Sequence, residues 1–250
     1  MKKKFWVIAI ILFLTFGNSA LAKNIDVLFI GNSYTAANSL PEMVAKIAAS
    51  DSKNTIQITP TQFTKNAAKL KQLLEEGEAV KTLYSKTHWD FVILQEQSAW
   101  ALYPYDVNRA YLAAREWHSL VKPRSSNIAF FSSWARQPKS HWYSDPETAE
   151  IFKDAIYMQK KLDDGGRKLA FIMGAVIIPI GDYWVYINSK HPEIQLYATD
   201  GSHPSLLGTY ATALVFYRYF TKINNVESVS YVPDGVDPNQ AKIIRQLLSR

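Results

Sequence analysis

The stretch DVLFIGNSYT, residues 26–35, joins an apolar, β-branched run to a polar Gly-Asn-Ser end. A short apolar run of this kind predicts a buried strand. The polar residues then fall at the carboxyl end of the strand, where Ser33 can present its hydroxyl at the edge of a sheet. Considered alone, Ser33 fits a turn or helix-cap serine as well as a nucleophile.

A second polar segment, DGSHP at residues 200–204, places Asp200 and His203 three positions apart near the C-terminus. A serine hydrolase needs a hydroxyl nucleophile, an imidazole base that removes its proton, and a carboxylate that orients the imidazole. Ser33, His203 and Asp200 supply these three groups. The alternative for the second segment is a chance Asp-x-x-His on the surface, although its place between a loop and an apolar helix constrains the turn.

Apolar stretches alternate with helical patterns along the chain, and this alternation predicts the fold class. The expected strands are residues 25–30, 55–59, 89–94, 127–131 and 175–180. Strands separated by helices predict an α/β fold with a parallel sheet covered on both faces. Ligands of such sheets bind beyond the carboxyl ends of the strands, and four polar segments fall there. They are Ser33, residues 95–97, residues 132–136 and the loop before Asp200.

Capping and breaking residues place the helices between these strands. Ser39 and Glu42 have the spacing of a capping box at the start of one helix. Residues 163–166 contain two glycines and are expected to interrupt a helix that begins near residue 147. Residues 181–199 are expected to form a long connection, and Asp237 to cap a terminal helix that opens with proline.

The N-terminus predicts a secretory signal peptide at residues 1–22. Three lysines precede an apolar run over residues 5–16, and small residues end at Ala22. A membrane anchor is the alternative, but the run is shorter than the roughly 20 residues that a spanning helix needs. We therefore expect cleavage after Ala22, a periplasmic or secreted protein, and no stable membrane insertion. Residues 23–250 suit one α/β domain.

Composition excludes several classes of function. The sequence has 28 Lys and Arg against 22 Asp and Glu, a formal charge of +6, and three of these lysines belong to the leader. Without a basic stripe interleaved with aromatics, this balance argues against nucleic-acid binding. The absence of cysteine excludes thiolate metal sites and cysteine catalysis. No metal-ligand spacing links the remaining histidines, which are His88, His118, His141 and His191. We expect neither a metal nor a cofactor.

Four segments together resemble the SGNH (GDSL-like) hydrolases. They are GNSYT at 31–35, LQEQS at 94–98, WAR at 134–136 and DGSHPS at 200–205. Their order and spacing are most similar to a branch of exported bacterial members and cover residues 25 to about 217. The resemblance implies a three-layer α/β/α sandwich of flavodoxin-like type and ester hydrolysis through a covalent acyl-enzyme. It implies Ser33 as nucleophile, His203 as base and Asp200 as its orienter, with the Ser33 backbone N–H donating to the oxyanion.

Two parts of the family pattern differ in this chain. The family's third block carries Gly-x-Asn, whose side-chain amide donates to the oxyanion. Here Gln97 aligns with that Asn, and Gln95 shares its strand face, so either amide could donate. The family's second block has a glycine whose backbone N–H donates. Its place falls near residues 63–66, where this sequence has no glycine.

Four further residues are grouped with the expected oxyanion and substrate site. Asn32 belongs to the nucleophile block and Trp134 to the Trp-Ala-Arg segment. Glu96 could bind substrate or hold the neighbouring glutamine side chains. Arg136 could pair with Glu96, clamp an anionic substituent of the substrate, or lie solvated in its loop.

These residues predict an exported serine esterase that removes small acyl groups, acetyl first among them, from a small-molecule or glycan ester. Carbohydrate is favoured by the expected export, the resemblance and six aromatic residues in loops at the active edge, because flat rings suit sugar faces. These are Trp100, Tyr103, Tyr105, Trp134, Trp142 and Trp184, and ordinary loop packing is their alternative role. Two other functions stay open: a lipase or thioesterase for longer acyl chains, which needs an apolar groove near the site, and a glycan-binding module with weak turnover.

Overall fold

The structure is a computed structural model that describes residues 23–125 and 127–249. The predicted signal peptide, residues 1–22, lies outside the described residues. Within the described ranges, no helix has the length and apolar character needed to cross a membrane.

In the described part of the chain, five parallel strands form one sheet in the order β2-β1-β3-β4-β5. Their bounds are β1 Lys23–Gly31, β2 Ile56–Thr64, β3 Phe91–Leu94, β4 Ile128–Ser132 and β5 Val176–Pro179. After β1 the chain moves outward to β2 and then crosses to β3 on the other side of β1. The winding direction therefore reverses at β1, which is where ligands bind in sheets of this kind. Ser33 follows β1 directly.

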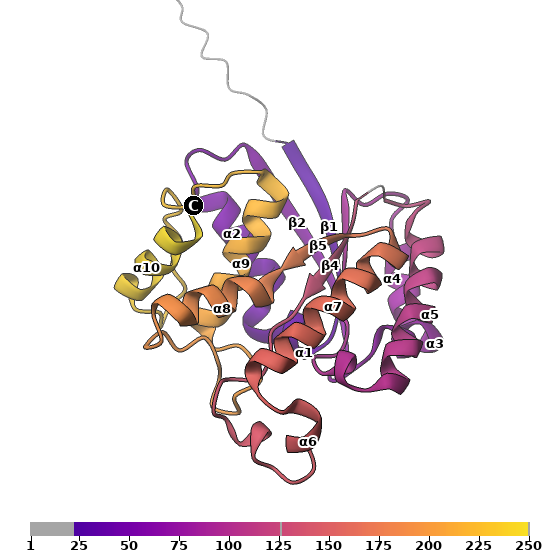
Figure 1. Cartoon of the computed structure of the whole chain (residues 1–250). Coiled ribbons are helices and arrows are strands. Elements are labelled where there is room, and N and C mark those ends of the chain that lie inside the picture. The colour runs from indigo at the N-terminus through magenta and orange to yellow at the C-terminus, as the bar shows by residue number, and fades with distance from the viewer. Residues whose placement is uncertain (1–22, 126, 250) are drawn as a thin grey trace, which may run out of the picture.

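Helices cover both faces of the sheet, as the sequence predicted (Figure 1). One layer consists of α2 Leu40–Ser50, α8 Ile180–Lys190, α9 Leu206–Thr221 and α10 Pro238–Leu248. The other consists of α3 Leu70–Glu76, α4 Glu78–Tyr84, α5 Pro104–Val121 and α7 Ala155–Met173. The short elements are α1 Ser33–Ala36, η1 Ala37–Ser39, η2 Trp100–Leu102, η3 His141–Tyr143 and α6 Ala149–Phe152.

The strands supply apolar side chains to both layers by simple alternation. Val27 and Phe29 pack in the core beneath α2 and α9, whereas Leu28 and Ile30 pack in the core beneath α5 and α7. This is the period of two that a strand imposes on its side chains. Since both faces are covered, the strand sequence is a continuous apolar run rather than an alternating one.

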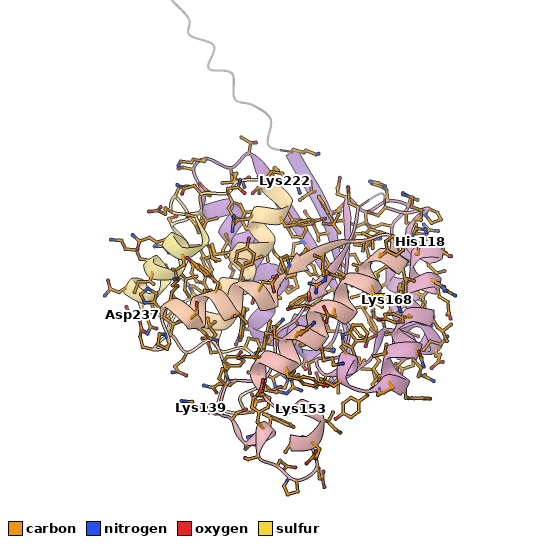
Figure 2. All side chains as sticks on the ribbon, in the orientation of Figure 1. His118, Lys139, Lys153, Lys168, Lys222 and Asp237 are labelled. Carbon is orange, nitrogen blue, oxygen red and sulfur yellow. The ribbon has the colours of Figure 1, made fainter. Side chains whose placement is uncertain are left out.

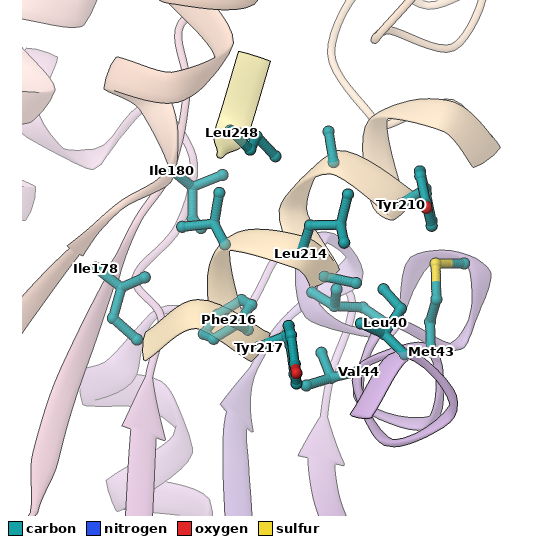
Figure 3. Close-up of a cluster of buried hydrophobic side chains, with 14 of the residues drawn as sticks. Leu40, Met43, Val44, Ile178, Ile180, Tyr210, Leu214, Phe216, Tyr217 and Leu248 are labelled. Atoms are coloured by element: carbon teal, nitrogen blue, oxygen red, sulfur yellow. The ribbon is translucent and has the colours of Figure 1, made fainter. Parts of the chain in front are cut away.

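Helix α9 is buried on nearly all sides and fixes the segment before it. Leu214, Phe216 and Tyr217 fill the core between the sheet and the side chains of α2 (Figure 3). Gly208 lets the helix pack against the chain at Leu196, because a Cβ at this position would lie 2.0 Å from the Leu196 carbonyl oxygen. The turn at residues 200–203 leads directly into α9, so this packing holds the turn in place.

Three predictions about the helices are wrong. Residues 181–199 are not one long connection, because α8 occupies Ile180–Lys190. Ile180, Trp184 and Ile187 recur at helical spacing along α8 and are all buried. The capping box is also absent: Ser39 has a left-handed backbone (φ 54°) and makes no side-chain cap, whereas an N-cap residue needs an extended backbone.

The glycine pair at residues 165–166 does not interrupt a helix, since α7 runs through it. Both glycines lie where the helix packs closely on its neighbours. A Cβ on Gly165 would meet the Trp100 ring at 3.1 Å, and one on Gly166 would meet the Phe130 ring at 3.2 Å. Close approach, and not a helix break, therefore explains these two residues. The terminal helix is as predicted, with the Asp237 side chain accepting a hydrogen bond from the Asn239 N–H.

Candidate active site

The three residues predicted to form a catalytic triad lie in one hydrogen-bonded chain. His203 Nε2 is 2.9 Å from Ser33 Oγ, and His203 Nδ1 is 2.6 Å from Asp200 Oδ2. A carboxylate only accepts, so Nδ1 carries the ring proton and Nε2 is left to accept the proton of Ser33. This is the arrangement that lets an imidazole act as a base toward a hydroxyl.

Asp200 is held in its ionised form by its own turn. Burial raises the pKa of Asp200, but hydrogen bonds from the His203 ring and from the backbone N–H groups of Ser202 and His203 outweigh this effect and hold the pKa below its ordinary value. Both backbone N–H groups donate to Oδ1 at 2.9 Å. Gly201 makes the turn possible with a left-handed backbone (φ 64°).

Two tryptophans in the segment after β4 donate hydrogen bonds to this turn. Trp134 Nε1 donates to the Ser202 carbonyl at 3.0 Å, and Trp142 Nε1 donates to the Asp200 carbonyl at 2.8 Å. Trp142 belongs to a protrusion at the bottom of Figure 1 that includes η3 and α6. Lys139 and Lys153, both with left-handed backbones (φ 63° and 57°), lie where this protrusion joins the body (Figure 2). The turn is thus fixed from two sides.

Asn32 and Gln95 hold the backbone around Ser33. The Asn32 side chain accepts from the Tyr34 N–H at 3.1 Å and donates to the Ala68 carbonyl at 3.1 Å. The Gln95 oxygen accepts from the Asn32 N–H at 3.0 Å, and its amide donates to the Glu96 carbonyl. The fold therefore uses the Gln95 oxygen and one of its two amide hydrogens and buries the side chain, whereas Gln97 is partly exposed and is the stronger candidate to donate to an oxyanion.

Candidate oxyanion donors come from three places. Ser33 is the first residue of α1, so its N–H has no acceptor inside the helix. Ala67, in the segment after β2, has a left-handed backbone (φ 55°), and among the described residues its N–H donates no hydrogen bond. Gln97 uses its oxygen to accept from the Ala99 N–H at 2.8 Å, and its nitrogen lies 3.4 Å from Ser98 Oγ. Ala67 is therefore a candidate for the backbone donor that the family glycine supplies.

Glu96 lies in the loop after β3 and is fully buried. Its oxygens accept from the Leu70 N–H at 3.2 Å and from the Gln97 N–H at 2.7 Å. The carboxylate thus ties the start of α3, just beyond Ala67, to the loop after β3. It makes no ion pair with Arg136, so that predicted alternative is wrong. Desolvation raises the pKa of Glu96 to about 7, although the two backbone N–H groups and the charge of Lys69 act in the opposite direction.

The raised pKa of Glu96 predicts that the free energy of unfolding depends on pH, and that Glu96→Gln removes this dependence. The folded pKa is raised, so the contribution of Glu96 is fully present below its ordinary pKa and is lost as pH rises through about 7. We expect the free energy of unfolding of the wild type, relative to Glu96→Gln, to fall by on the order of 2–3 kcal/mol between pH 5 and pH 8. Urea unfolding at several pH values measures this difference.

The control for this prediction is Glu116→Gln, which changes a carboxylate that is half exposed and paired with Lys71. Its pH dependence should follow that of the wild type. Parallel curves for the wild type and Glu96→Gln would show that Glu96 does not titrate in this range.

Three of the tryptophans predicted to stack on sugar are instead buried. Trp100, Trp134 and Trp184 are at most 2% exposed, so they offer a sugar ring almost no accessible surface for stacking. Trp134 stacks between Tyr34 and Trp184, with ring centroids 4.7 and 3.8 Å away. The stack contacts the triad, because the Tyr34 ring meets the His203 ring edge-on, with the two ring centroids 5.4 Å apart.

The triad itself lies open to solvent. The side chains of His203 and Asp200 are 43% and 44% exposed. A cavity of about 600 Å³ lies close by, between α7 and α8, and is lined by residues that include Trp134, Gln159, Trp184 and Tyr197. None of Ser33, Asp200 and His203 lines it. An acyl group on Ser33 would therefore face the surface and not this cavity.

Known proteins were compared with the chain at the levels of sequence and structure. No protein-family model and no curated protein matches the sequence. Among solved structures, a DUF4886 family protein from Bacteroides uniformis has a TM-score of 0.73 at 19% identity, covering 91% of this chain and 94% of its own. A candidate SGNH hydrolase from Slackia heliotrinireducens has a TM-score of 0.61 at 20% identity, covering 79% and 100%. The fold is that of the SGNH hydrolases.

A third similar structure is an acetylxylan esterase from Geobacillus stearothermophilus, with a TM-score of 0.52 at 14% identity over 85% of this chain and 97% of that one. At these identities the likeness shows the fold alone, and that fold is the one implied by the resemblance of the four sequence segments. The sequence did not predict Tyr34, Ser98 or Ser202 as parts of the site, although each lies inside one of those segments. Their spatial contact across the three segments is visible only in the folded chain.

Proposed function

We propose that this protein is an exported serine esterase that removes small acyl groups, acetyl first among them, from carbohydrate. One observation carries the proposal: Ser33, His203 and Asp200 form a continuous hydrogen-bonded chain at the carboxyl edge of the sheet. The 2.9 Å contact between Ser33 and His203 favours a hydrolase over a binding module that has lost turnover. The SGNH-hydrolase fold agrees with this chemistry.

The geometry supports a two-step mechanism. His203 Nε2 removes the Ser33 proton while Ser33 Oγ attacks the ester carbonyl, and Asp200 stabilises the imidazolium that forms. The Ser33 N–H, the Ala67 N–H and the Gln97 amide are the candidate donors to the oxyanion. His203 then returns the proton to the departing alcohol, which leaves an acyl group on Ser33. A water molecule, deprotonated by His203, attacks this acyl-enzyme and releases the acid.

The openness of the triad supports small acyl groups. The neighbouring cavity of about 600 Å³ is not lined by the triad, so an acyl chain on Ser33 gains no apolar groove there. An exposed site instead leaves room for a large alcohol part, such as a sugar polymer. The similar acetylxylan esterase adds support for acetylated carbohydrate. The three buried tryptophans add no support for a carbohydrate substrate, because almost none of their surface is accessible.

A series of p-nitrophenyl esters tests the acyl preference. We expect kcat/KM on octanoate to show no gain over acetate, because the longer chain finds little apolar surface to bury, whereas each buried methylene would otherwise contribute about 0.8 kcal/mol. Acetate release from acetylated xylo-oligosaccharides, measured beside this series, tests the alcohol part. A higher kcat/KM on octanoate than on acetate would favour the lipase or thioesterase alternative.

A further inference from the structure

Arg136 is a buried cation without a carboxylate partner. The residue is 5% exposed, and among the described residues no carboxylate lies within ion-pair distance of it. Its guanidinium lies over the rings of Trp142 and Phe152, 5.1 and 5.8 Å from their centroids, and its buried Nε donates no hydrogen bond. Burying an unpaired charge is costly, so this arrangement calls for a compensating role.

The guanidinium donates to two side chains that border the triad. Nη1 donates to Tyr34 Oη at 2.7 Å, and Nη2 donates to Ser98 Oγ at 3.0 Å. Arginine has no acceptor, so the Tyr34 oxygen receives this hydrogen bond and its own proton is free for Ser202 Oγ, 2.9 Å away. A hydrogen-bonded chain therefore runs from Arg136 through Tyr34 to Ser202.

Each arm ends beside a different part of the catalytic machinery. Tyr34 follows the nucleophile in sequence, and Ser202 lies between Asp200 and His203, so the first arm joins the two halves of the triad. Ser98 follows Gln97 and lies 3.4 Å from the Gln97 amide nitrogen, so the second arm reaches a candidate oxyanion donor. These segments come from the ends of β1, β3 and β4 and from the turn before α9.

We propose that Arg136 is a positioning residue of the esterase, which sets the placement of Ser33, the His203 turn and Gln97 through Tyr34 and Ser98. The inference rests on the proposed function. Arg136 touches no reacting atom in this scheme and acts through the two hydroxyl groups. Its charge, with five donors in a rigid plane, suits it to hold two oxygens at fixed angles, which lysine does less well.

A double-mutant cycle on p-nitrophenyl acetate hydrolysis tests this role. Arg136→Met should lower kcat by about 10- to 100-fold with KM changed less than about twofold, because the machinery and not substrate binding is disturbed. Tyr34→Phe should lower kcat through the same arm. The double variant should then be much less impaired than the product of the two single effects, since they remove one shared chain. Arg136→Lys should restore part of the loss.

The matched control is Arg109→Met, which removes a partly exposed arginine on α5 that donates to the Tyr105 hydroxyl at 3.2 Å and pairs with Glu75 at 3.3 Å. Its kcat should equal that of the wild type. Thermal unfolding of every variant shows whether it is folded. If Arg136→Met does not fold, Arg136→Lys and Tyr34→Phe are combined in the cycle instead. The positioning role would be overturned if the effects of the two single substitutions on kcat simply multiplied in the double variant. It would also be overturned if the loss of kcat followed the folded fraction of each variant.

The rate at which a fluorophosphonate labels Ser33, followed by intact mass, separates this inference from the proposed function. Labelling needs an activated serine and no ester turnover. If the wild type labels but does not hydrolyse esters, the proposed function fails, and slower labelling of Arg136→Met and Tyr34→Phe still supports positioning. If the wild type does not label, Arg136 has no activated nucleophile to position and the inference fails as well.

Discussion

Ser33→Ala is expected to abolish ester hydrolysis, lowering kcat on p-nitrophenyl acetate by about 10³–10⁶-fold. The substitution removes the only protein atom in the proposed scheme that bonds to the acyl carbon. His203 and Asp200 stay in place, because the Asp200 turn is held by its own backbone N–H groups and by Trp134 and not by the serine. Initial rates from purified residues 23–250, with and without the substitution, measure the effect.

The control is Ser119→Ala, on the exposed face of α5, where the hydroxyl bonds only to the Arg115 carbonyl. This variant should keep the full rate. Equal rates for Ser33→Ala and the wild type would remove Ser33 as nucleophile and favour the glycan-binding module. Intact mass after brief mixing with the ester should show an acetyl adduct in the wild type and none in Ser33→Ala.

The sheet could be predicted because each strand is buried on both faces. Residues such as Val27, Leu28, Phe29 and Ile30 form an uninterrupted apolar run, and short runs of this kind between helical patterns have few other structures available. Helix α8 was missed although its apolar residues have helical spacing. Pro179 lies just before its first residue and Gly181 lies in its first turn, and both residue types usually mark a loop.

The site was only partly predictable for a different reason. Ser33 and His203 were paired by their chemistry, since no periodicity relates residues 170 positions apart. Burial, by contrast, depends on the packing of the whole chain, so Trp134 and Trp184 were expected at a surface where the structure places a stacked core. Ala67 as a candidate donor could not be predicted, because a left-handed backbone at an alanine has no signal in the sequence, unlike one at a glycine.

Asp200→Asn is expected to lower kcat by about 10²–10⁴-fold while leaving the fold intact. Asparagine keeps the oxygen that accepts from the Ser202 and His203 N–H groups, so the turn retains its shape. Its amide, however, donates where the carboxylate oxygen accepted, at 2.6 Å from His203 Nδ1. The imidazole then favours the tautomer with its proton on Nε2, which cannot take the proton of Ser33.

A matched substitution isolates the catalytic effect from the loss of one carboxylate. Asp237→Asn changes the N-cap residue of α10, which is labelled in Figure 2 and is not part of the triad. Asparagine caps a helix as well as aspartate does. Its kcat should equal that of the wild type. Because the Asp200 side chain is 44% exposed, water can replace part of its role, so we expect the loss to fall in the lower half of the stated range. An Asp200→Asn enzyme as fast as the wild type would mean that His203 needs no orienting carboxylate, and the contact between them would then be a feature of the turn alone.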